Sequence, residues 1–152
     1  MLDMGCGLGL YLENYAGLSL GIDLSPANIE ACKKKGLNVL LADANFFWTK
    51  KVWDSVLLVH VLEHLEDPSK TLINAWKNTN LRGRIIIVVP SLLCFMNGFN
   101  NLIGHRQFIN ETYVHHYLSR LGCKKIKSYT FPPISLPYFG RYQELRMVYQ
   151  KR

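Results

Sequence analysis

The sequence lacks paired cysteines, long apolar runs and a secretion signal. Its cysteines, Cys6, Cys32, Cys94 and Cys123, are scattered and form no Cys-x-x-Cys pair. This argues against a zinc ribbon or a disulfide scaffold and is typical of a reducing compartment. No apolar run reaches the roughly 18 residues that span a bilayer, and the N-terminus has no basic-then-apolar pattern of a signal peptide. We therefore expect a cytoplasmic protein.

What is present is the composition of one globular domain, residues 1–152. Hydrophobic residues make up 49% of the chain and charged residues 19%, which is enough apolar material for a sizeable core. The formal net charge of +7 favours anionic partners. The cations are nevertheless spread over short clusters such as Lys33–Lys35 and Lys124–Lys127, so a nucleic-acid partner is not favoured.

Apolar runs alternate with stretches of helical period, which predicts a mostly parallel sheet covered by helices. Strands are expected over residues 1–4, 18–23, 38–43, 53–60 and 84–90, the last preceded by a turn at Gly83. Helices are expected over residues 8–15, 26–35, 68–78 and 111–121. Two closing strands, 124–131 and 144–150, have no helix between them and should pair antiparallel. Residues 91–110 form a connection longer than a plain loop, which is typical of a functional segment.

The most informative segment is residues 2–9, where Gly5, Gly7 and Gly9 alternate shortly after Asp3. Glycine tolerates positive φ and has no Cβ, so a ligand can lie directly against this backbone. The N–H groups of the helix expected over residues 8–15 would face that ligand with partial positive charge. The segment is therefore a candidate cofactor loop. Its glycines are one residue closer than in the Gly-x-Gly-x-x-Gly dinucleotide fingerprint.

Two further carboxylates follow the next two expected strands. Asp23 ends the second strand, where a carboxylate can bind both hydroxyls of a ribose, and the alternative is a simple cap or turn carboxylate. Asp43, followed by Ala44, ends the third strand, where Asp can accept from an adenine amino group. The alternative for Asp43 is ordinary turn chemistry. The segment from His60 to Pro68 follows the fourth strand.

With these segments in order, the sequence resembles the class I S-adenosylmethionine-dependent methyltransferases, in particular their ubiquinone-biosynthesis-like small-molecule branch. The matching segments are residues 2–9, 21–25, 41–44 and 53–68. The resemblance implies an α/β fold with a Rossmann-like, doubly wound, seven-stranded sheet. That sheet would be mostly parallel with an antiparallel C-terminal strand, and its first strand would be truncated. It also implies S-adenosylmethionine as cofactor and a substrate-side insertion at residues 91–110.

The same resemblance implies the roles of single residues. Asp3 and the glycines would shape the loop around the methionine part of the cofactor, Asp23 would hold the ribose, and Asp43 with Ala44 the adenine. His60 would line the site near the sulfonium, largely through its backbone. The implied cofactor-binding set is Asp3, Gly5, Cys6, Gly7, Gly9, Asp23, Leu24, Asp43, Ala44 and His60.

Three histidines are candidate general bases or site-lining residues: His60, His64 and His105. For His105, a structural ring bonded to a loop carbonyl is the alternative. The run from His60 to His64 also matches the His-x-x-Glu-His pattern of some zinc peptidases. That chemistry requires both histidines on one helix face and a third ligand, whereas here the run follows an apolar strand. No metal is expected.

The leading interpretation is methyl transfer to an oxygen, nitrogen or carbon of a small-molecule acceptor, apolar or anionic in character. The aromatic residues 92–99 could line an apolar pocket, contact a membrane surface or simply pack on the sheet, and Tyr138, Phe139 and Tyr142 could close the same pocket. The glycine loop lies so near Met1 that the chain is expected to be a fragment or a variant without the usual N-terminal cover.

That short N-terminus motivates one alternative, a non-catalytic methyltransferase-like module. A third reading, an NAD-dependent oxidoreductase, is disfavoured by the glycine spacing and by the antiparallel last strand. The oligomeric state does not follow from the sequence.

Overall fold

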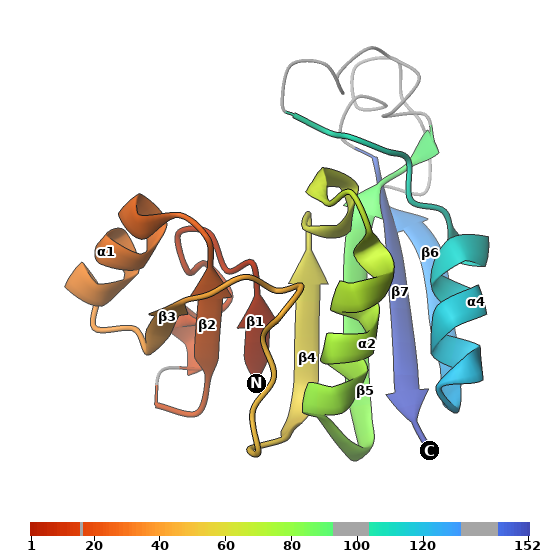
Figure 1. The fold of residues 1–152 in the computed structure, drawn as a ribbon, viewed down its shortest axis with the longest axis horizontal. Helices are drawn as coiled ribbons and strands as arrows, with labels where there is room; N and C mark the ends of the chain where they lie inside the picture. The colour runs from red at the N-terminus through yellow and green to blue at the C-terminus, as the bar shows by residue number, and fades with distance from the viewer. Residues whose placement is uncertain (16, 93–103, 132–142) are drawn as a thin grey trace.

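Seven strands form one sheet in the computed structural model, which describes residues 1–15, 17–92, 104–131 and 143–152 (Figure 1). Their order across the sheet is β3-β2-β1-β4-β5-β7-β6. The strands are β1 (Leu2–Met4), β2 (Leu20–Asp23), β3 (Val39–Leu41), β4 (Trp53–Val59), β5 (Thr79–Pro90), β6 (Cys123–Phe131) and β7 (Glu144–Lys151). Residues 93–99 and 132–142, for which a substrate pocket or membrane contact was considered, lie outside the described residues.

The pairing pattern confirms the expected fold class. Strands β1 to β5 pair in parallel, whereas β7 lies antiparallel between β5 and β6. The first strand has three residues, as short as the sequence predicted. The chain leaves β1 toward β2 on one side and returns to β4 on the other. In open sheets of this kind, ligands bind outside the carboxyl ends of the strands at such a reversal.

Each of the described α-helices begins at a side-chain cap. Ser25 Oγ accepts from Asn28 N at 3.3 Å, Asp67 Oδ1 from Ser69 N at 3.1 Å, and Asn110 Oδ1 from Tyr113 N at 2.8 Å. These bonds satisfy N–H groups that have no partner inside the helix. The helices are α1 (Pro26–Lys34), α2 (Pro68–Asn78) and α4 (Glu111–Arg120), with two 3-10 turns, η1 (Glu13–Tyr15) and η2 (Leu62–His64).

The helix expected over residues 8–15 does not form, and this prediction was wrong. Turns occupy most of the segment, and η1 is its one regular piece. Gly9 at φ +81° and Gly17 at φ +83° both hold left-handed conformations, which interrupt a right-handed helix. The few residues between these two glycines would form too few helical hydrogen bonds to offset the cost of helix nucleation. The glycine loop therefore has no helix N-terminus behind it.

A second prediction also fails, because Gly83 is not the turn before β5 but lies inside it. The pairing of β5 with β4 shifts register between Trp53 and Ser55, and Arg82 stands at φ +64°. A Cβ on Gly83 would lie 2.8 Å from Thr79 Cγ2 and 2.9 Å from Asn80 O. Glycine thus allows the strand to continue through an irregular segment.

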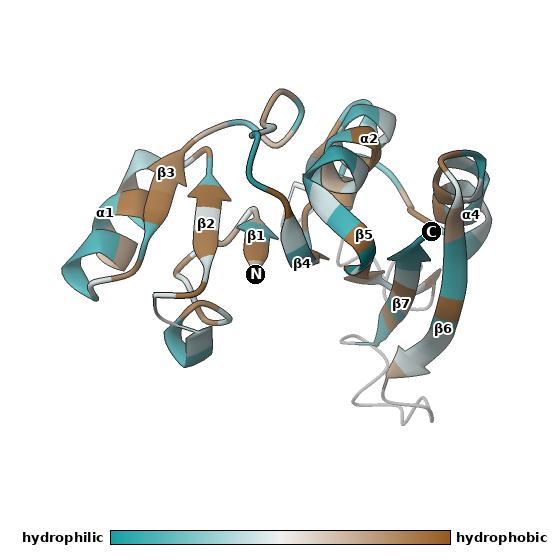
Figure 2. Cartoon of the chain, turned by 90° about the horizontal axis from the view of Figure 1, so that it is seen from below, coloured by the Kyte–Doolittle hydropathy of each residue, from teal (hydrophilic) through white to brown (hydrophobic). Residues whose placement is uncertain are grey.

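The two faces of the sheet are covered unequally. On one face, α2 and α4 pack over β4 to β6 and enclose the larger core, which includes Leu58, Ile87 and Tyr149 (Figures 1 and 2). On the other face, a smaller cluster joins α1 to the β3 end of the sheet through Ile29, Cys32 and other residues. None of the described helices is long and apolar enough to cross a membrane.

Candidate functional site

A cleft of about 180 Å³ opens at the carboxyl ends of β1, β2 and β4. Its position is the one where sheets of this topology bind ligands. It brings together residues from four separate segments of the sequence, including most of the predicted cofactor set. Its lining consists of Gly5, Asp23, Leu24, Ala42, Asp43, Ala44, His60, Val61, His64 and Leu65.

The glycine loop reaches this cleft because its backbone is bonded to β2. The N–H groups of Gly5 and Cys6 both donate to Ile22 O, at 2.8 and 2.9 Å. Gly5 has φ +87°, and a Cβ there would lie 2.4 Å from Val61 Cγ2. A Cβ on Gly7, at φ +53°, would meet nothing within 4 Å. The loop therefore packs tightly at Gly5 and leaves backbone open at Gly7, as a ligand cradle requires.

Cys6 and Gly9, two members of the predicted cofactor-binding set, pack against neighbouring residues and hold the glycine loop in place. The side chain of Cys6 is buried against Gly21, where a Cβ would lie 2.7 Å from Cys6 Sγ. Burial raises the pKa of the Cys6 thiol to about 12, so the thiol stays protonated and packs as a small apolar group. Gly9 packs against Leu37, since a Cβ there would be 2.5 Å from Leu37 Cδ1. Neither residue lines the cleft.

Asp3 is buried below the loop and has no donor among the described residues. It is 1% exposed, and neither of its carboxyl oxygens accepts a hydrogen bond. Burial raises the pKa of Asp3 to about 7, and the nearby charge of Asp23 adds to the effect. A buried polar group without a partner is costly and rare in folded proteins. The Asp3 carboxyl can therefore accept from a donor that the described residues do not supply.

Asp23 makes the contacts of a turn carboxylate and also lines the cleft. Its Oδ2 accepts from Gly7 N at 2.8 Å, and its Oδ1 accepts from Ser25 N at 2.8 Å and from Asn28 Nδ2 at 3.2 Å. The carboxylate thus ties the glycine loop to the start of α1 while it also lines the cleft. Asp43 likewise accepts from Asn45 N at 2.8 Å, which is turn chemistry, and lines the cleft as well.

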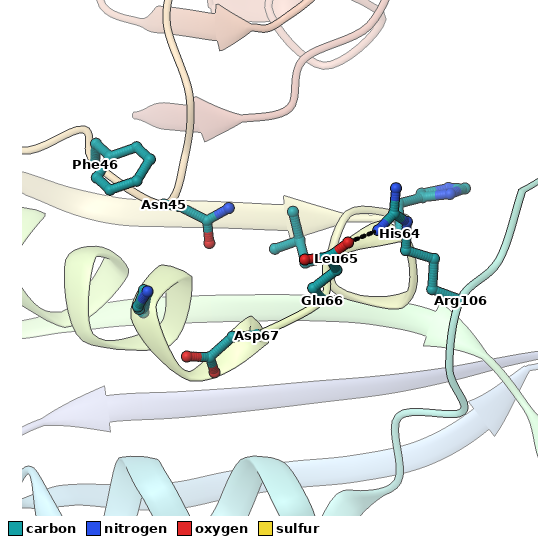
Figure 3. Close-up of a pocket in the computed structure, with 8 residues that line it drawn as sticks. Asn45, Phe46, His64, Leu65, Glu66, Asp67 and Arg106 are labelled. Atoms are coloured by element: carbon teal, nitrogen blue, oxygen red, sulfur yellow. Dashed lines mark hydrogen bonds and ion pairs between the residues drawn. The ribbon is translucent and has the colours of Figure 1, made fainter.

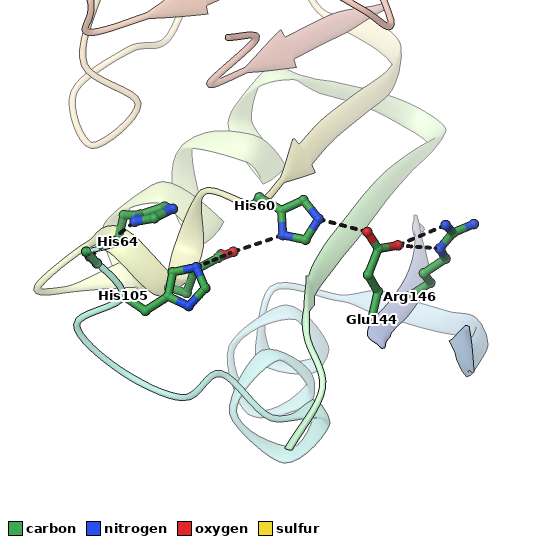
Figure 4. A network of polar contacts seen from close by, with 7 residues as sticks. His60, His64, His105, Glu144 and Arg146 are labelled. Atoms are coloured by element: carbon green, nitrogen blue, oxygen red, sulfur yellow. Dashed lines mark hydrogen bonds and ion pairs between the residues drawn. The ribbon is translucent and has the colours of Figure 1, made fainter. Parts of the chain in front are cut away.

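His60 is held as an imidazolium between two carboxylates (Figure 4). Its Nδ1 lies 3.1 Å from Glu63 Oε1, and its Nε2 lies 2.9 Å from Glu144 Oε1. The hydrogen bonds to Glu144 and Glu63 outweigh burial and raise the pKa of His60 to about 9. Arg146 donates to the other oxygen of Glu144, at 3.0 and 2.8 Å. A ring with both nitrogens protonated cannot accept a proton, so His60 is not a general base at neutral pH.

Glu144 was absent from the candidates because nothing near it in the sequence marks it. It begins β7 and lies opposite Pro90 at the end of β5, which places it beside the carboxyl end of β4. Only the strand order β4-β5-β7 makes this contact.

His64 lines the cleft with a ring that is hydrogen-bonded through Nδ1. It is exposed at the end of η2, and its Nδ1 lies 3.2 Å from Gly104 O. A carbonyl only accepts, so Nδ1 carries the proton and Nε2 of the neutral ring is the basic nitrogen. His105 lies behind it with ring centroids 4.9 Å apart. The side chain of His105 is only 3% exposed, and burial lowers its pKa.

Glu63, His64 and His105 also place their ligand atoms within 4.8 Å of one another, which is a donor set that can bind a divalent metal. Glu63 Oε2 is buried without a hydrogen-bond partner among the described residues. The predicted zinc alternative used His60 instead, but His60 follows the end of β4 and its ring is held by Glu144. Any role assigned to His64 therefore requires a test for metal binding by these three residues.

A second, polar hollow of about 310 Å³ adjoins the cleft and shares His64 and Leu65 with it (Figure 3). Asn45 and Phe46 from the segment after β3 line it on one side, and Arg106 pairs with Glu66 on the other. Ligand pockets usually measure about 300 Å³ or more. The hollow therefore gives the narrow cleft the room that a nucleotide-sized ligand needs.

Comparison with known proteins identifies relatives of this arrangement. Residues 2–87 match the family model of a methyltransferase domain. A tRNA (carboxymethyluridine(34)-5-O)-methyltransferase of Arabidopsis thaliana is 38% identical over 72 residues, 46% of this chain and 18% of that protein. The mitochondrial ubiquinone biosynthesis O-methyltransferase of Candida albicans is 32% identical over 101 residues, 57% of this chain and 31% of that protein. The chain thus spans less than a third of the length of either relative.

Among solved structures, the N-methyltransferase NodS of Bradyrhizobium japonicum with bound S-adenosyl-L-homocysteine has the same fold. It superposes with a TM-score of 0.76 at 19% identity, covering 99% of this chain and 76% of NodS. At 19% identity, the match shows only that the two proteins share a fold.

Proposed function

The chain belongs to the methyltransferase-domain family, and from this premise we propose that it transfers a methyl group from S-adenosylmethionine to a hydroxyl oxygen of a small-molecule acceptor. S-adenosylmethionine is the methyl donor of this family. The observation that carries the proposal is that one cleft is lined by Gly5, Asp23, Asp43 and His64. It unites a glycine backbone, two carboxylates and an imidazole.

The residues present fit the cofactor. S-adenosylmethionine presents hydrogen-bond donors along its length: an ammonium group, two ribose hydroxyls and an adenine amino group. The chain offers acceptors: the carboxylates of Asp23 and Asp43 line the cleft, and the buried carboxyl of Asp3, which has no partner among the described residues, lies below the glycine loop. We assign Asp3 with the open backbone of Gly7 to the methionine part, Asp23 to the ribose, and Asp43 with Ala44 to the adenine.

When bound, the cofactor supplies a methyl group already activated by its sulfonium. The chain then has to align the acceptor, exclude water and remove a proton from the acceptor hydroxyl. Nε2 of His64 takes that proton, because His60 is protonated and His105 is buried behind the His64 ring. His60 remains a fixed cation that ties the end of β4 to β7 through Glu144.

Two features support an oxygen acceptor on a small molecule. The two curated relatives described above carry O-methyltransferase names, one for a tRNA and one for ubiquinone biosynthesis, and a hydroxyl is an acceptor that benefits from a base such as His64. The lining of the cleft contains no lysine or arginine among the described residues, whereas Lys70 and Arg106 line the adjoining hollow, where Arg106 pairs with Glu66. An RNA acceptor would require phosphate contacts, which the lining of the cleft itself does not offer.

Calorimetry and a transfer assay test the proposal. The protein should bind S-adenosylhomocysteine and not NADH, and it should methylate members of a panel of small hydroxylated acceptors. His64→Gln keeps the ring's donor function in part but has no basic nitrogen, so we expect kcat to fall about 100-fold with unchanged affinity for S-adenosylhomocysteine. The matched control is His116→Gln, an exposed histidine on α4.

The outcomes separate the alternatives. Binding of NADH alone would overturn the proposal, and binding of neither ligand would favour a non-catalytic module. Methyl transfer should persist in EDTA. Loss of activity in EDTA that returns with added Zn²⁺ or Mg²⁺ would reassign His64 from base to metal ligand, together with Glu63 and His105.

A further inference from the structure

The wall of the cleft at Asp43 and Ala44 belongs to the irregular connection between β3 and β4 (Figure 1). The chain turns directly after Asp43, whose backbone oxygen accepts from Phe46 N and Phe47 N at 3.0 and 2.9 Å. Among the described residues, no backbone N–H donates to the carbonyl oxygens of Ala44 and Asn45. Side chains have to satisfy these two acceptors, because carbonyl groups shielded from water rarely lack a partner.

A single side chain of α2 donates to both of these carbonyl groups. Asn74 Nδ2 lies 3.2 Å from Ala44 O and 2.7 Å from Asn45 O. Asn74 is 6% exposed and Ala44 is 7% exposed, so a lost donor here would leave an acceptor without water to replace it. Both partners are acceptors, and only the amide nitrogen of Asn74 can donate to them. An asparagine is therefore required at this position in a way that an aspartate is not.

Asn74 is the middle member of a polar row on α2, which also contains Thr71 and Asn78. The three positions share one face of the helix, since residues three and four apart are neighbours on its surface. Thr71 Oγ1 donates to Asn45 Oδ1 at 2.9 Å, and Asn78 Nδ2 donates to Phe47 O at 3.1 Å. All three side chains are buried. The row therefore holds the segment after β3 against α2, away from solvent.

Asp43 has one carboxylate oxygen left for a ligand. Its Oδ1 accepts from Asn45 N at 2.8 Å, whereas no described residue donates to its Oδ2. Asn74 holds the carbonyl groups of Ala44 and Asn45, and Asn45 in turn holds Oδ1, so Asn74 determines where Oδ2 lies in the cleft. A hydrogen bond weakens steeply once its length or angle departs from the preferred range. A small shift of this wall would therefore cost the bond that Oδ2 makes to a ligand.

We propose that Asn74 is a positioning residue that sets the selectivity of the cleft for adenine over a purine without the exocyclic amino group. This role rests on the proposed function, in which Asp43 with Ala44 binds the adenine. The carboxylate accepts from an amino group but repels the carbonyl oxygen that hypoxanthine has at the same place. Selectivity therefore requires Oδ2 of Asp43 at hydrogen-bond distance, and Asn74 supplies that geometry from α2.

Calorimetry with S-adenosylhomocysteine and S-inosylhomocysteine tests the role of Asn74. The second compound differs only in a carbonyl oxygen that replaces the adenine amino group. The wild-type protein should bind S-adenosylhomocysteine about 30-fold more tightly, as expected for one hydrogen bond to a charged group. Asn74→Asp keeps the size of the side chain but turns a carboxylate toward two carbonyl oxygens, so this preference should fall by about tenfold.

The matched control is Asn78→Asp. Asn78 is buried in the same polar row, but its amide donates to Phe47 O, farther along the chain from Asp43. Urea unfolding should show that both variants are destabilised, whereas only Asn74→Asp should change the ratio of the two affinities. A purely structural role of Asn74 would leave that ratio unchanged.

Thr71→Val is a second, milder variant, because it keeps the shape of the side chain and removes only the bond to Asn45 Oδ1. It should lower the preference by about threefold, and it decides the question if Asn74→Asp does not fold. An unchanged preference in the folded Asn74→Asp variant would overturn the role of Asn74. So would an equal loss of preference in Asn78→Asp, or an unchanged preference in Thr71→Val where Asn74→Asp is unfolded.

Asp43→Asn distinguishes a failure of this role from a failure of the proposed function. It should remove the preference in the same way as Asn74→Asp. A wild-type protein that binds both compounds equally, or a preference that survives in Asp43→Asn, would refute the adenine assignment and the role of Asn74 with it. A wild-type preference lost in Asp43→Asn but kept in Asn74→Asp would leave the adenine assignment intact and overturn the role of Asn74 alone.

Discussion

The three candidate histidines have different surroundings in the structure, and the atoms around each ring distinguish them. His60 faces two carboxylates and is cationic, His64 faces a carbonyl and has a basic nitrogen, and His105 is buried with a lowered pKa. In the sequence they were equivalent candidates. The distinction depends on Glu144 and Gly104, which are distant from His60 and His64 along the chain.

The raised pKa of His60 predicts a loss of stability at high pH. Its folded pKa of about 9 lies above the ordinary value of 6.5, so the stabilisation is complete below pH 6.5 and is lost as the pH rises through 9. Because the side chain is 41% exposed, we expect only about 1 kcal/mol after solvent screening. Urea unfolding at pH 6 and pH 9.5 measures this change, and His60→Gln should reduce it. An equal pH dependence in His60→Gln and wild type would contradict the prediction.

Among elements, the glycine loop shows how one segment can need glycine for two different reasons. Gly5 is confined by Val61 of the segment after β4, whereas Gly7 only adopts a left-handed φ. The sequence pattern indicated the loop but could not distinguish these positions. The distinction arises because η2 and the residues before it pack on the loop from another strand.

This difference predicts unequal costs of substitution. Gly5→Ala should destabilise the protein by about 3 kcal/mol, since it adds a clash to the cost of a positive φ. Gly7→Ala should cost about 1 kcal/mol from φ alone. Gly122→Ala is a control, because it shares a positive φ and open space at a site remote from the cleft. Chemical denaturation measures all three, and Val61→Ala should relieve part of the Gly5→Ala cost. Equal losses for Gly5 and Gly7 would refute the packing role.

The helices expected over residues 26–35, 68–78 and 111–121 all form. Ser25-Pro26, Asp67-Pro68 and Asn110 each begin a helix in the structure. Residues 8–15 had helix-compatible side chains but stood between two glycines that adopt left-handed conformations. Backbone conformation at those glycines outweighed side-chain propensity, which is a weak determinant over so short a run.

At the scale of the whole molecule, cofactor binding should stabilise the fold, because the cleft joins segments from β1, β2, β3 and β4. At a ligand concentration 100-fold above Kd, S-adenosylhomocysteine should add about 2.7 kcal/mol, or roughly 5–10 °C in Tm for a chain of this size. Differential scanning fluorimetry measures the shift.

Asp23→Ala should abolish most of this shift if Asp23 holds the ribose. Asn28→Ala is its matched control, because it removes one hydrogen bond to Asp23 and leaves the carboxylate in place. A full shift in Asp23→Ala would refute the ribose assignment. A shift lost equally in both variants would show that Asp23 acts through the position of the loop instead.

The sequence by itself determined the order of strands and helices, the antiparallel closing pair and the segments that meet at the carboxyl edge. These follow from local periodicity, from caps and from the geometry of parallel sheets, which brings strand ends together whatever the side chains. Only the tertiary structure decided the charge on His60 and the burial of the Asp3 carboxyl. Each depends on which atoms surround a side chain in space. Those atoms belong to residues that are distant in sequence, and a local sequence pattern does not identify them.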